Sequence, residues 1–162
     1  MQTPEAVTKV LRLIQERLKQ QGASIATAES CTGGLLAYLF TELAGSSGIY
    51  LGGVSAYANA AKIELLGIDP EQLNHFGAVS APVAAAMADG IRTRLGSTYA
   101  LSLTGIAGPG GGSAAKPVGT VFCALSGIEA TRVYPLAFTG DRHAIRWAAA
   151  VAALHYLHEA LA

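Results

Sequence analysis

The spacing between short apolar segments limits the folds open to this chain. In the first half, segments of strand length at residues 23–28 and 52–57 are separated by segments of helical length. In the second half, three such segments, at residues 98–107, 117–126 and 129–138, follow one another with no helical segment between them. Parallel strands need a long crossover, whereas antiparallel strands need only a turn. The sequence therefore predicts an α/β protein with three layers, in which helices flank a mixed sheet of about five strands.

The spacing of apolar and capping residues predicts where the helices lie. Apolar side chains recur every three or four residues between Val7 and Leu18, and Gly22 follows them, which predicts a first helix over residues 4–21. Apolar content and capping residues predict further helices at residues 33–44, 59–67, 69–77, 80–96 and 141–162. No linker or repeat divides the chain, so residues 1–162 are expected to form a single domain.

Composition excludes several classes of function. Eleven basic and eleven acidic residues cancel, and only 14% of residues are charged, so no broad basic surface is available for nucleic acid. No apolar run approaches the ~18 residues of a membrane span, and the charged N-terminal segment is unlike a signal peptide. Cys31 and Cys123 are too few for a disulfide scaffold. We expect a cytoplasmic protein that binds neither nucleic acid nor membranes, and its Ala-rich apolar content suggests a homo-oligomer.

Small and polar residues are concentrated in the segment TAESCTGGLL, residues 27–36, between a predicted strand and a predicted helix. A simple junction needs only a turn and one capping residue. Ligand sites in α/β proteins lie at the carboxyl ends of strands, where loops meet helix N-termini. Unpaired N–H groups from Cys31 to Gly34 would surround the Ser30 hydroxyl and are suited to stabilising an oxyanion. The alternative is that Ser30 or Thr32 only caps the helix.

A second glycine-rich segment, TGIAGPGGGSAAKPVGT at residues 104–120, joins two predicted strands. It lacks the Gly-Lys-Ser/Thr sequence of a Walker loop, and a strand follows it where a dinucleotide-binding motif requires a helix. The segment is either part of a ligand site or a flexible hairpin connection.

Nucleophilic catalysis by a hydroxyl needs a group that accepts its proton. The four histidines do not provide an obvious one, and the pair His155 and His158 lacks a third ligand at a metal-binding spacing, so no metal site is predicted. Lys62 lies in an otherwise apolar neighbourhood. Burial lowers the pKa of an amine, so Lys62 is a candidate neutral base near pH 7. A Ser-Lys pair is a known variant of the Ser-His-Asp arrangement.

Four motifs lie at residues 27–68, 75–90 (HFGAVSAPVAAAMADG), 103–122 (LTGIAGPGGGSAAKPVGTVF) and 138–146 (FTGDRHAIR). In order and spacing they resemble the CinA carboxy-terminal domain family, the nicotinamide-nucleotide amidohydrolases (PncC, NMN deamidases). The resemblance implies deamidation of nicotinamide mononucleotide to nicotinate mononucleotide and ammonia, a hydrolase reaction of NAD salvage without metal or cofactor. Since no nucleotide-pyrophosphatase-type domain precedes the motifs, it implies the free-standing amidase rather than the two-domain CinA form.

The resemblance also implies roles for individual residues. Ser30 would be the nucleophile, Lys62 the general base, and Tyr57 the hydroxyl that orients the lysine or relays the proton. N–H groups beginning at Cys31 or Thr32 would bind the oxyanion. Arg142, assisted by Arg146 and the glycine-rich loop, would bind the phosphate. The implied substrate-binding set is Glu29, Cys31, Thr32, Gly33, Thr104, Gly105, Gly108 and Arg142.

Two catalytic assignments stay open on sequence alone. Glu29, Lys62 and Cys31 have the residue types of a nitrilase-like amidase, which makes Cys31 the rival nucleophile. Ser30 is preferred, because neighbouring side chains diverge and only one of the two can face Lys62. Glu29 would either bind ribose hydroxyls or anchor the turn.

Hydroxyls outside this turn are also candidates for the nucleophile. Ser46 and Ser47 provide two of them, although a turn after a helix explains both residues. For the function as a whole, a non-catalytic nucleotide-binding module or an assembly domain of the same fold is the alternative to an enzyme.

Overall fold

The predicted strands form one mixed sheet in the order β2-β1-β3-β4-β5. The computed structural model describes residues 3–162. Strands β2, β1 and β3 are parallel, and β4 and β5 continue the sheet antiparallel to their neighbours. The α/β class and the mixed sheet predicted from sequence are confirmed. The strand bounds are β1 Ile25–Glu29, β2 Tyr50–Ser55, β3 Tyr99–Gly105, β4 Thr120–Ser126 and β5 Thr131–Ala137.

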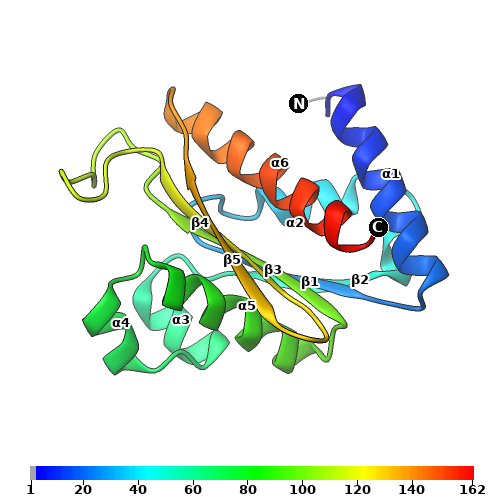
Figure 1. The fold of residues 1–162 in the computed structure, drawn as a ribbon, viewed down its shortest axis with the longest axis horizontal. Coiled ribbons are helices and arrows are strands. Elements are labelled where there is room, and N and C mark those ends of the chain that lie inside the picture. Colours follow the sequence, from blue (N-terminus) through cyan, green and yellow to red (C-terminus); the bar gives the residue numbers. More distant parts are fainter. Residues whose placement is uncertain (1–2) are drawn as a thin grey trace.

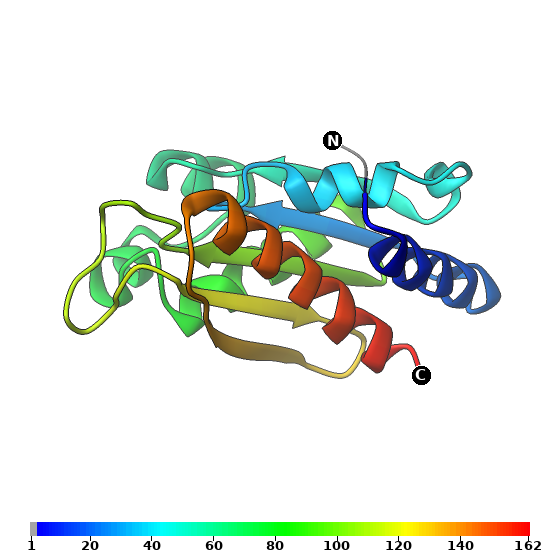
Figure 2. The same cartoon turned by 90° about the horizontal axis from the view of Figure 1, so that it is seen from above.

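Helices cover both faces of the sheet (Figures 1 and 2). One layer consists of α1 (Glu5–Gln20), α2 (Leu35–Thr41) and α6 (Arg142–Ala160). The opposite layer consists of α3 (Asn59–Leu66), α4 (Pro70–Phe76) and α5 (Ala81–Leu95). A single 3₁₀ turn, η1 (Ser46–Gly48), precedes β2. Among residues 3–162, no helix has the length and apolar content needed to cross a membrane.

Helix α2 is shorter than the predicted range of residues 33–44. Gly33 and Gly34 have φ of +60° and +94°, a left-handed conformation that glycine adopts without steric cost and that cannot continue a right-handed helix. The helix therefore starts at Leu35, after a turn made by residues 31–34. This turn separates the end of β1 from α2 and gives the candidate site its local backbone shape.

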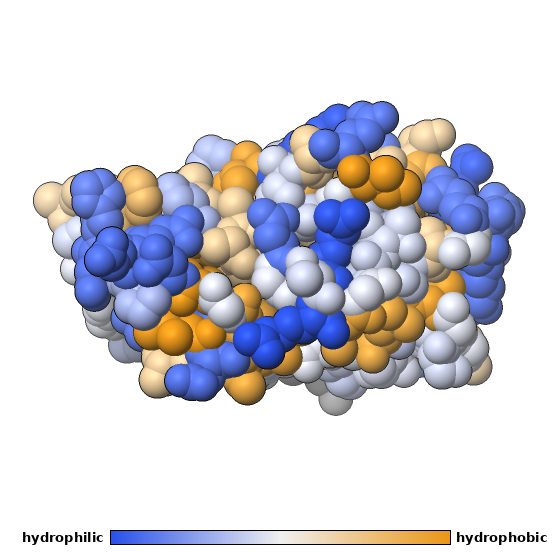
Figure 3. Space-filling model, turned by 90° about the horizontal axis from the view of Figure 1, so that it is seen from below, coloured by the Kyte–Doolittle hydropathy of each residue, from blue (hydrophilic) through white to orange (hydrophobic). Residues whose placement is uncertain are grey.

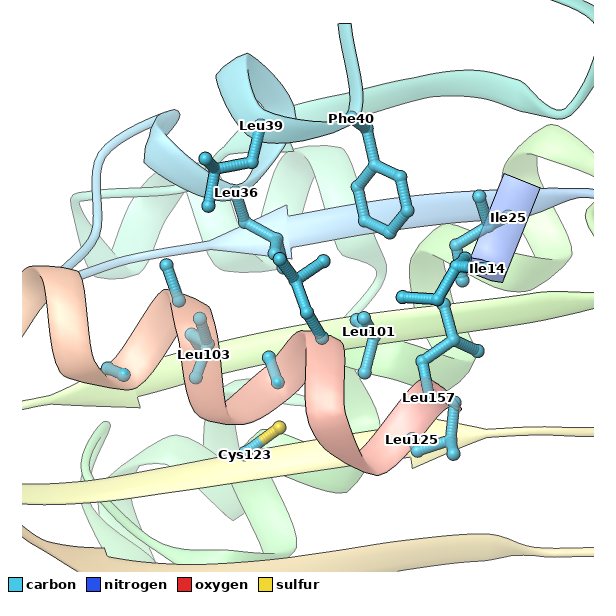
Figure 4. Packing of buried hydrophobic residues seen from close by; sticks show 14 of the residues in the cluster. Ile14, Ile25, Leu36, Leu39, Phe40, Leu101, Leu103, Cys123, Leu125 and Leu157 are labelled. Carbon is cyan, nitrogen blue, oxygen red and sulfur yellow. The ribbon is translucent and has the colours of Figure 1, made fainter. Parts of the chain in front are cut away.

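The larger core lies between the sheet and the layer of α1, α2 and α6 (Figure 4). Alternate residues of each strand point into it, such as Ile25 of β1 and Leu101 and Leu103 of β3. Leu36 of α2 and Ile14 of α1 meet them from the helical layer. Each of these side chains is fully buried, and burying one stabilises the fold by roughly 1.5–3 kcal/mol.

The alanine-rich helical faces are used inside the chain. Ala84 and Ala88 of α5 are fully buried against β4, and Ala149, Ala150 and Ala153 of α6 are fully buried in the larger core. These five alanines therefore pack elements of the chain against one another. The surface on the side of α3, α4 and α5 carries hydrophobic patches beside hydrophilic ones (Figure 3).

One edge of the sheet gathers the segments singled out from sequence. The parallel strands β1, β2 and β3 end there, at Glu29, Ser55 and Gly105. The glycine-rich loop leaves β3 at this edge and returns to β4, and the first turn of α6 lies at the same end of the molecule (Figure 2). The carboxyl ends of parallel strands are the usual location of a ligand site in this class of fold.

Candidate active site

Strand alternation directs Ser30 and Cys31 to opposite faces of the sheet. Ala26 and Ala28 of β1 face the layer of α3 to α5, while Ile25 faces the larger core. The Ser30 N–H donates to the Leu103 carbonyl at 2.9 Å, which extends the β1–β3 pairing by one residue beyond β1. Ser30 therefore faces the same layer as Ala28, and Cys31 joins the larger core.

Lys62 approaches Ser30 from that layer. Its Nζ lies 3.1 Å from Ser30 Oγ, 2.9 Å from the carbonyl oxygen of Ala56 and 3.2 Å from that of Tyr57. Side chains on a helix lean toward its N-terminus, so a lysine on the first turn of α3 reaches back to the segment that precedes the helix. The lysine predicted as the base is in hydrogen-bond contact with the serine predicted as the nucleophile.

Burial shifts the protonation equilibrium of Lys62 toward the neutral amine. The side chain is only 1% exposed, and burial lowers its pKa below the ordinary 10.5, while the coulombic effect of Cys31 raises it. Lys62 Nζ donates to Ser30 Oγ and to the carbonyl oxygens of Ala56 and Tyr57, three acceptors that match the three hydrogens of an ammonium. Once the ammonium has lost a proton, the two carbonyls, which only accept, would keep the two remaining hydrogens and leave the lone pair toward Ser30 Oγ.

Cys31 is poorly suited to be the nucleophile. Its side chain is 6% exposed and belongs to the larger core. The pKa of the Cys31 thiol is raised to about 11, mainly by burial. The charge of Glu29 also raises it, whereas the Cys31 N–H and the charges of Arg146 and Arg142 lower it. At neutral pH the thiolate is scarce, and the nucleophilic form of cysteine is the thiolate. The structure favours Ser30 over Cys31.

Glu29 anchors the start of α2. Its carboxylate accepts hydrogen bonds from the backbone N–H groups of Gly34, Leu36 and Ala37 at 3.1, 3.0 and 2.8 Å. A carboxylate at this end of a helix pairs with unsatisfied N–H groups and with the positive end of the helix dipole. Of the two roles considered for Glu29, the structure supports the anchor, because both carboxylate oxygens already accept backbone donors.

This anchor also limits the donors available to an oxyanion. The Gly33 N–H donates to the Ser30 carbonyl at 3.2 Å, and that of Gly34 donates to Glu29. In the described part of the chain, the N–H groups of Cys31 and Thr32 donate to no other residue. Of the N–H groups from Cys31 to Gly34 that were predicted to bind an oxyanion, only those of Cys31 and Thr32 therefore remain available.

The Tyr57 hydroxyl does not contact Lys62, contrary to the predicted role. It accepts a hydrogen bond from Arg142 Nη2 at 3.0 Å, and the side chain is 62% exposed. Only the main-chain carbonyl of Tyr57 contacts the lysine. Arg142 Nη1 donates to the Gly108 carbonyl at 2.8 Å, which ties the glycine-rich loop to α6. Tyr57, Gly108 and Arg142 thus form a polar, partly exposed rim beside the buried pair.

Thr104 and Gly105 make structural contacts at the end of β3. Thr104 is buried, and its hydroxyl donates to the Ala78 carbonyl at 2.7 Å. A Cβ added at Gly105 would lie 2.8 Å from the carbonyl oxygen of Thr120 and 2.7 Å from a methyl group of Val121, so glycine allows close β3–β4 pairing.

Two residues at this edge were not assigned to the site from sequence. Lys116, in the glycine-rich loop, donates to the Val79 carbonyl at 2.6 Å and holds the loop against the segment before α5. Ser55 ends β2 next to Glu29 and is exposed. Ser55 could have been noticed from sequence, because it is a polar residue at the end of a parallel strand. No sequence pattern indicates the contact between Lys116 and the Val79 carbonyl.

The hydroxyls of Ser46 and Ser47 lie away from the site. Both residues precede β2, whereas the site lies at the other end of that strand, and the Ser46 hydroxyl donates to the Leu43 carbonyl at 2.7 Å. Within residues 3–162, no group of three or more His, Cys, Asp or Glu side chains is placed to hold a metal ion.

Sequence comparison identifies curated relatives. A CinA-like protein of Geotalea daltonii is 54% identical over 143 residues, which are 88% of this chain and 35% of that protein. A putative competence-damage inducible protein of Halothermothrix orenii is 47% identical over 149 residues, which are 91% of this chain and 36% of that protein. The chain thus spans 35–36% of the length of these relatives.

Solved structures of similar fold cover nearly the whole chain. The competence/damage inducible protein CihA from Agrobacterium tumefaciens has a TM-score of 0.95 at 40% identity, covering 99% of this chain and 98% of that one. A CinA superfamily protein from Escherichia coli has a TM-score of 0.91 at 30% identity, covering 97% of this chain and 92% of that one. Residues 7–161 match the model of the CinA C-terminal domain. The chain therefore belongs to the CinA C-terminal domain family.

Proposed function

We propose that the chain is an amidase that hydrolyses nicotinamide mononucleotide to nicotinate mononucleotide and ammonia. The observation that carries the proposal is the 3.1 Å contact between Lys62 Nζ and Ser30 Oγ. That distance lies within the reach required for proton transfer to a general base. A nucleophile paired with a buried base of lowered pKa is the arrangement needed for acyl transfer.

In the first half of the reaction, Lys62 takes the proton of the Ser30 hydroxyl while Oγ attacks the carboxamide carbon. The oxyanion that forms accepts hydrogen bonds from the N–H groups of Cys31 and Thr32. The ammonium of Lys62 then returns its proton to the amide nitrogen, and the C–N bond breaks. Ammonia leaves, and a nicotinoyl ester remains on Ser30.

In the second half, Lys62 takes a proton from a water molecule that attacks the ester carbonyl. Collapse of this intermediate breaks the bond to Oγ, and the proton returns to Ser30. The product is the carboxylic acid, so amide and water are converted to acid and ammonia in balance. The pyridine acid and the regenerated serine complete the cycle without a metal or redox cofactor.

The phosphate is assigned to the rim made by Tyr57, Gly108 and Arg142. Arg142 is exposed, and it is the first residue of the long helix α6. A guanidinium at a helix N-terminus combines a permanent charge with the positive end of the helix dipole. We expect a nucleotide to bind with its phosphate at this rim and its pyridine at Ser30.

Ammonia release by the purified protein tests the proposal. Nicotinamide mononucleotide is expected to be turned over, and nicotinamide riboside, which lacks the phosphate, is expected to have a higher KM. Calorimetry on the same sample separates catalysis from binding. Tight binding of the nucleotide without ammonia release would instead identify a non-catalytic nucleotide-binding module.

A further inference from the structure

One arginine of α6 contacts the turn that carries the nucleophile, yet no step above uses it. Arg146 Nη2 donates to the main-chain carbonyl of Thr32 at 2.6 Å, across 114 positions of sequence. A Cβ added at Gly33 would lie 3.6 Å from the same nitrogen, so the guanidinium packs directly against the turn. Arg142, one helical turn earlier, contacts Tyr57 and Gly108 and not this turn.

The contact fixes a peptide unit next to the oxyanion donors. Thr32 contributes its N–H to the free donor pair and its carbonyl to Arg146, so both groups depend on the orientation of one residue. Glu29 holds the turn from the other side by binding Gly34. Within the turn, the Gly33 N–H donates to the Ser30 carbonyl at 3.2 Å and the Leu35 N–H donates to the Thr32 carbonyl at 3.4 Å, so Arg146 adds a side-chain contact to a carbonyl that also accepts a long backbone hydrogen bond.

Thr32 and Arg146 each also have a buried polar atom without a hydrogen-bond partner. Within residues 3–162, Thr32 Oγ1 and Arg146 Nε are both buried and find no hydrogen-bond partner. Most buried polar groups in native proteins are paired, and the exceptions call for an explanation. An arginine that leaves one donor unpaired is costly for a purely structural contact, because an apolar side chain could fill the same space.

We infer that Arg146 is a positioning residue for the nucleophile turn: by holding the Thr32 carbonyl it aims the Cys31 and Thr32 N–H groups at the oxyanion. This inference rests on the proposed function for its substrate, although the geometry applies to any electrophile attacked by Ser30. It assigns the two arginines of α6 different tasks. Arg142 acts on binding, and Arg146 acts on the chemical step.

Arg146→Met and Arg146→Lys test the inference, with His143→Ala, an exposed site on the same helix, as the matched control. Arg146→Met is expected to lower kcat for nicotinamide mononucleotide roughly 10–100-fold with KM nearly unchanged, and Arg146→Lys to recover part of the loss. Thermal unfolding reports whether each variant is folded. A folded Arg146→Met protein with the kcat of the wild type would overturn the inference. If Arg146→Met is unfolded, the kcat of Arg146→Lys is compared with that of the wild type, and equal values would overturn the inference.

A second measurement does not depend on the amide substrate. An alkyl fluorophosphonate reacts with an activated serine: Oγ bonds to phosphorus, fluoride leaves, and the hydroxyl proton passes to the base. Labelling of Ser30 is expected to slow in Arg146→Met by a factor similar to the loss in kcat. If the wild type releases no ammonia but is labelled at Ser30 in an Arg146-dependent manner, the proposed function fails and the inference stands. If labelling is absent in the wild type or insensitive to Arg146, the inference is wrong.

Discussion

The carboxylate of Glu29 accepts a hydrogen bond from the backbone N–H of Ala37 at 2.8 Å, which joins the end of β1 to the first turn of α2. Glu29 is 1% exposed and also accepts from Gly34 and Leu36. Glu29→Ala leaves these donors unpaired in the interior, and we expect it to lower the free energy of unfolding by about 2–4 kcal/mol. Urea denaturation measures the loss. Glu16→Ala, at an exposed position of α1, is the control and is expected to change stability little.

The fold was predictable because each element carries its own local signal. The alternation of strand and helix in the first half, and the run of three strands in the second, specified a mixed sheet before any contact was known. The divergence of Ser30 and Cys31 followed from the two-residue period of a strand. The start of α2 was less predictable, since Gly33 and Gly34 adopt a left-handed conformation that their residue type allows but does not require.

The contacts of the site were less predictable than its residues. The Ser30–Lys62 pair could be named, but the carbonyls of Ala56 and Tyr57 that orient the amine belong to main chain, which has no sequence signature. The hydroxyl of Tyr57 was expected at Lys62 and lies at Arg142, because the backbone before α3 directs its carbonyl inward and its side chain outward. The direction in which a carbonyl or a side chain points at such a position depends on tertiary geometry and not on residue type.

We expect Lys62 to set the pH dependence of the proposed activity. Burial lowers its pKa, so the neutral base exists at lower pH than for an exposed lysine. We expect kcat/KM for ammonia release to rise with pH as Lys62 loses its proton, with a midpoint below 10.5. Initial rates between pH 6 and 10 at constant ionic strength measure this rise of kcat/KM with pH. A profile that falls with rising pH over the whole range would show that the ammonium, and not the amine, is the active form.

Cys31 is dispensable for the proposed chemistry. Its thiol has a pKa of about 11 and lies in the larger core. Cys31→Ala is therefore expected to keep kcat within about threefold of the wild type and to lose roughly 1 kcal/mol of stability from the space left behind. Cys123→Ala, which removes the buried thiol of β4, is the matched control. Loss of ammonia release in Cys31→Ala alone would transfer the nucleophile role to the thiol.

Substitution of Arg142 is expected to affect phosphate binding and not the chemical step. Arg142→Ala removes the exposed guanidinium that contacts Tyr57 and Gly108. We expect KM for nicotinamide mononucleotide to rise roughly 10–100-fold, while KM for nicotinamide riboside changes little, because only the nucleotide carries the phosphate. Steady-state kinetics on both substrates measures the difference. Equal effects on the two would assign Arg142 to another part of the substrate.

Ammonia release from nicotinamide mononucleotide by Ser30→Ala, compared with the wild type and with Lys62→Met, tests whether the Ser30–Lys62 pair is catalytic. We expect the wild type to turn over and each variant, still folded by circular dichroism, to lose at least roughly 10³-fold in kcat. A folded Ser30→Ala protein that releases ammonia at the rate of the wild type would contradict it.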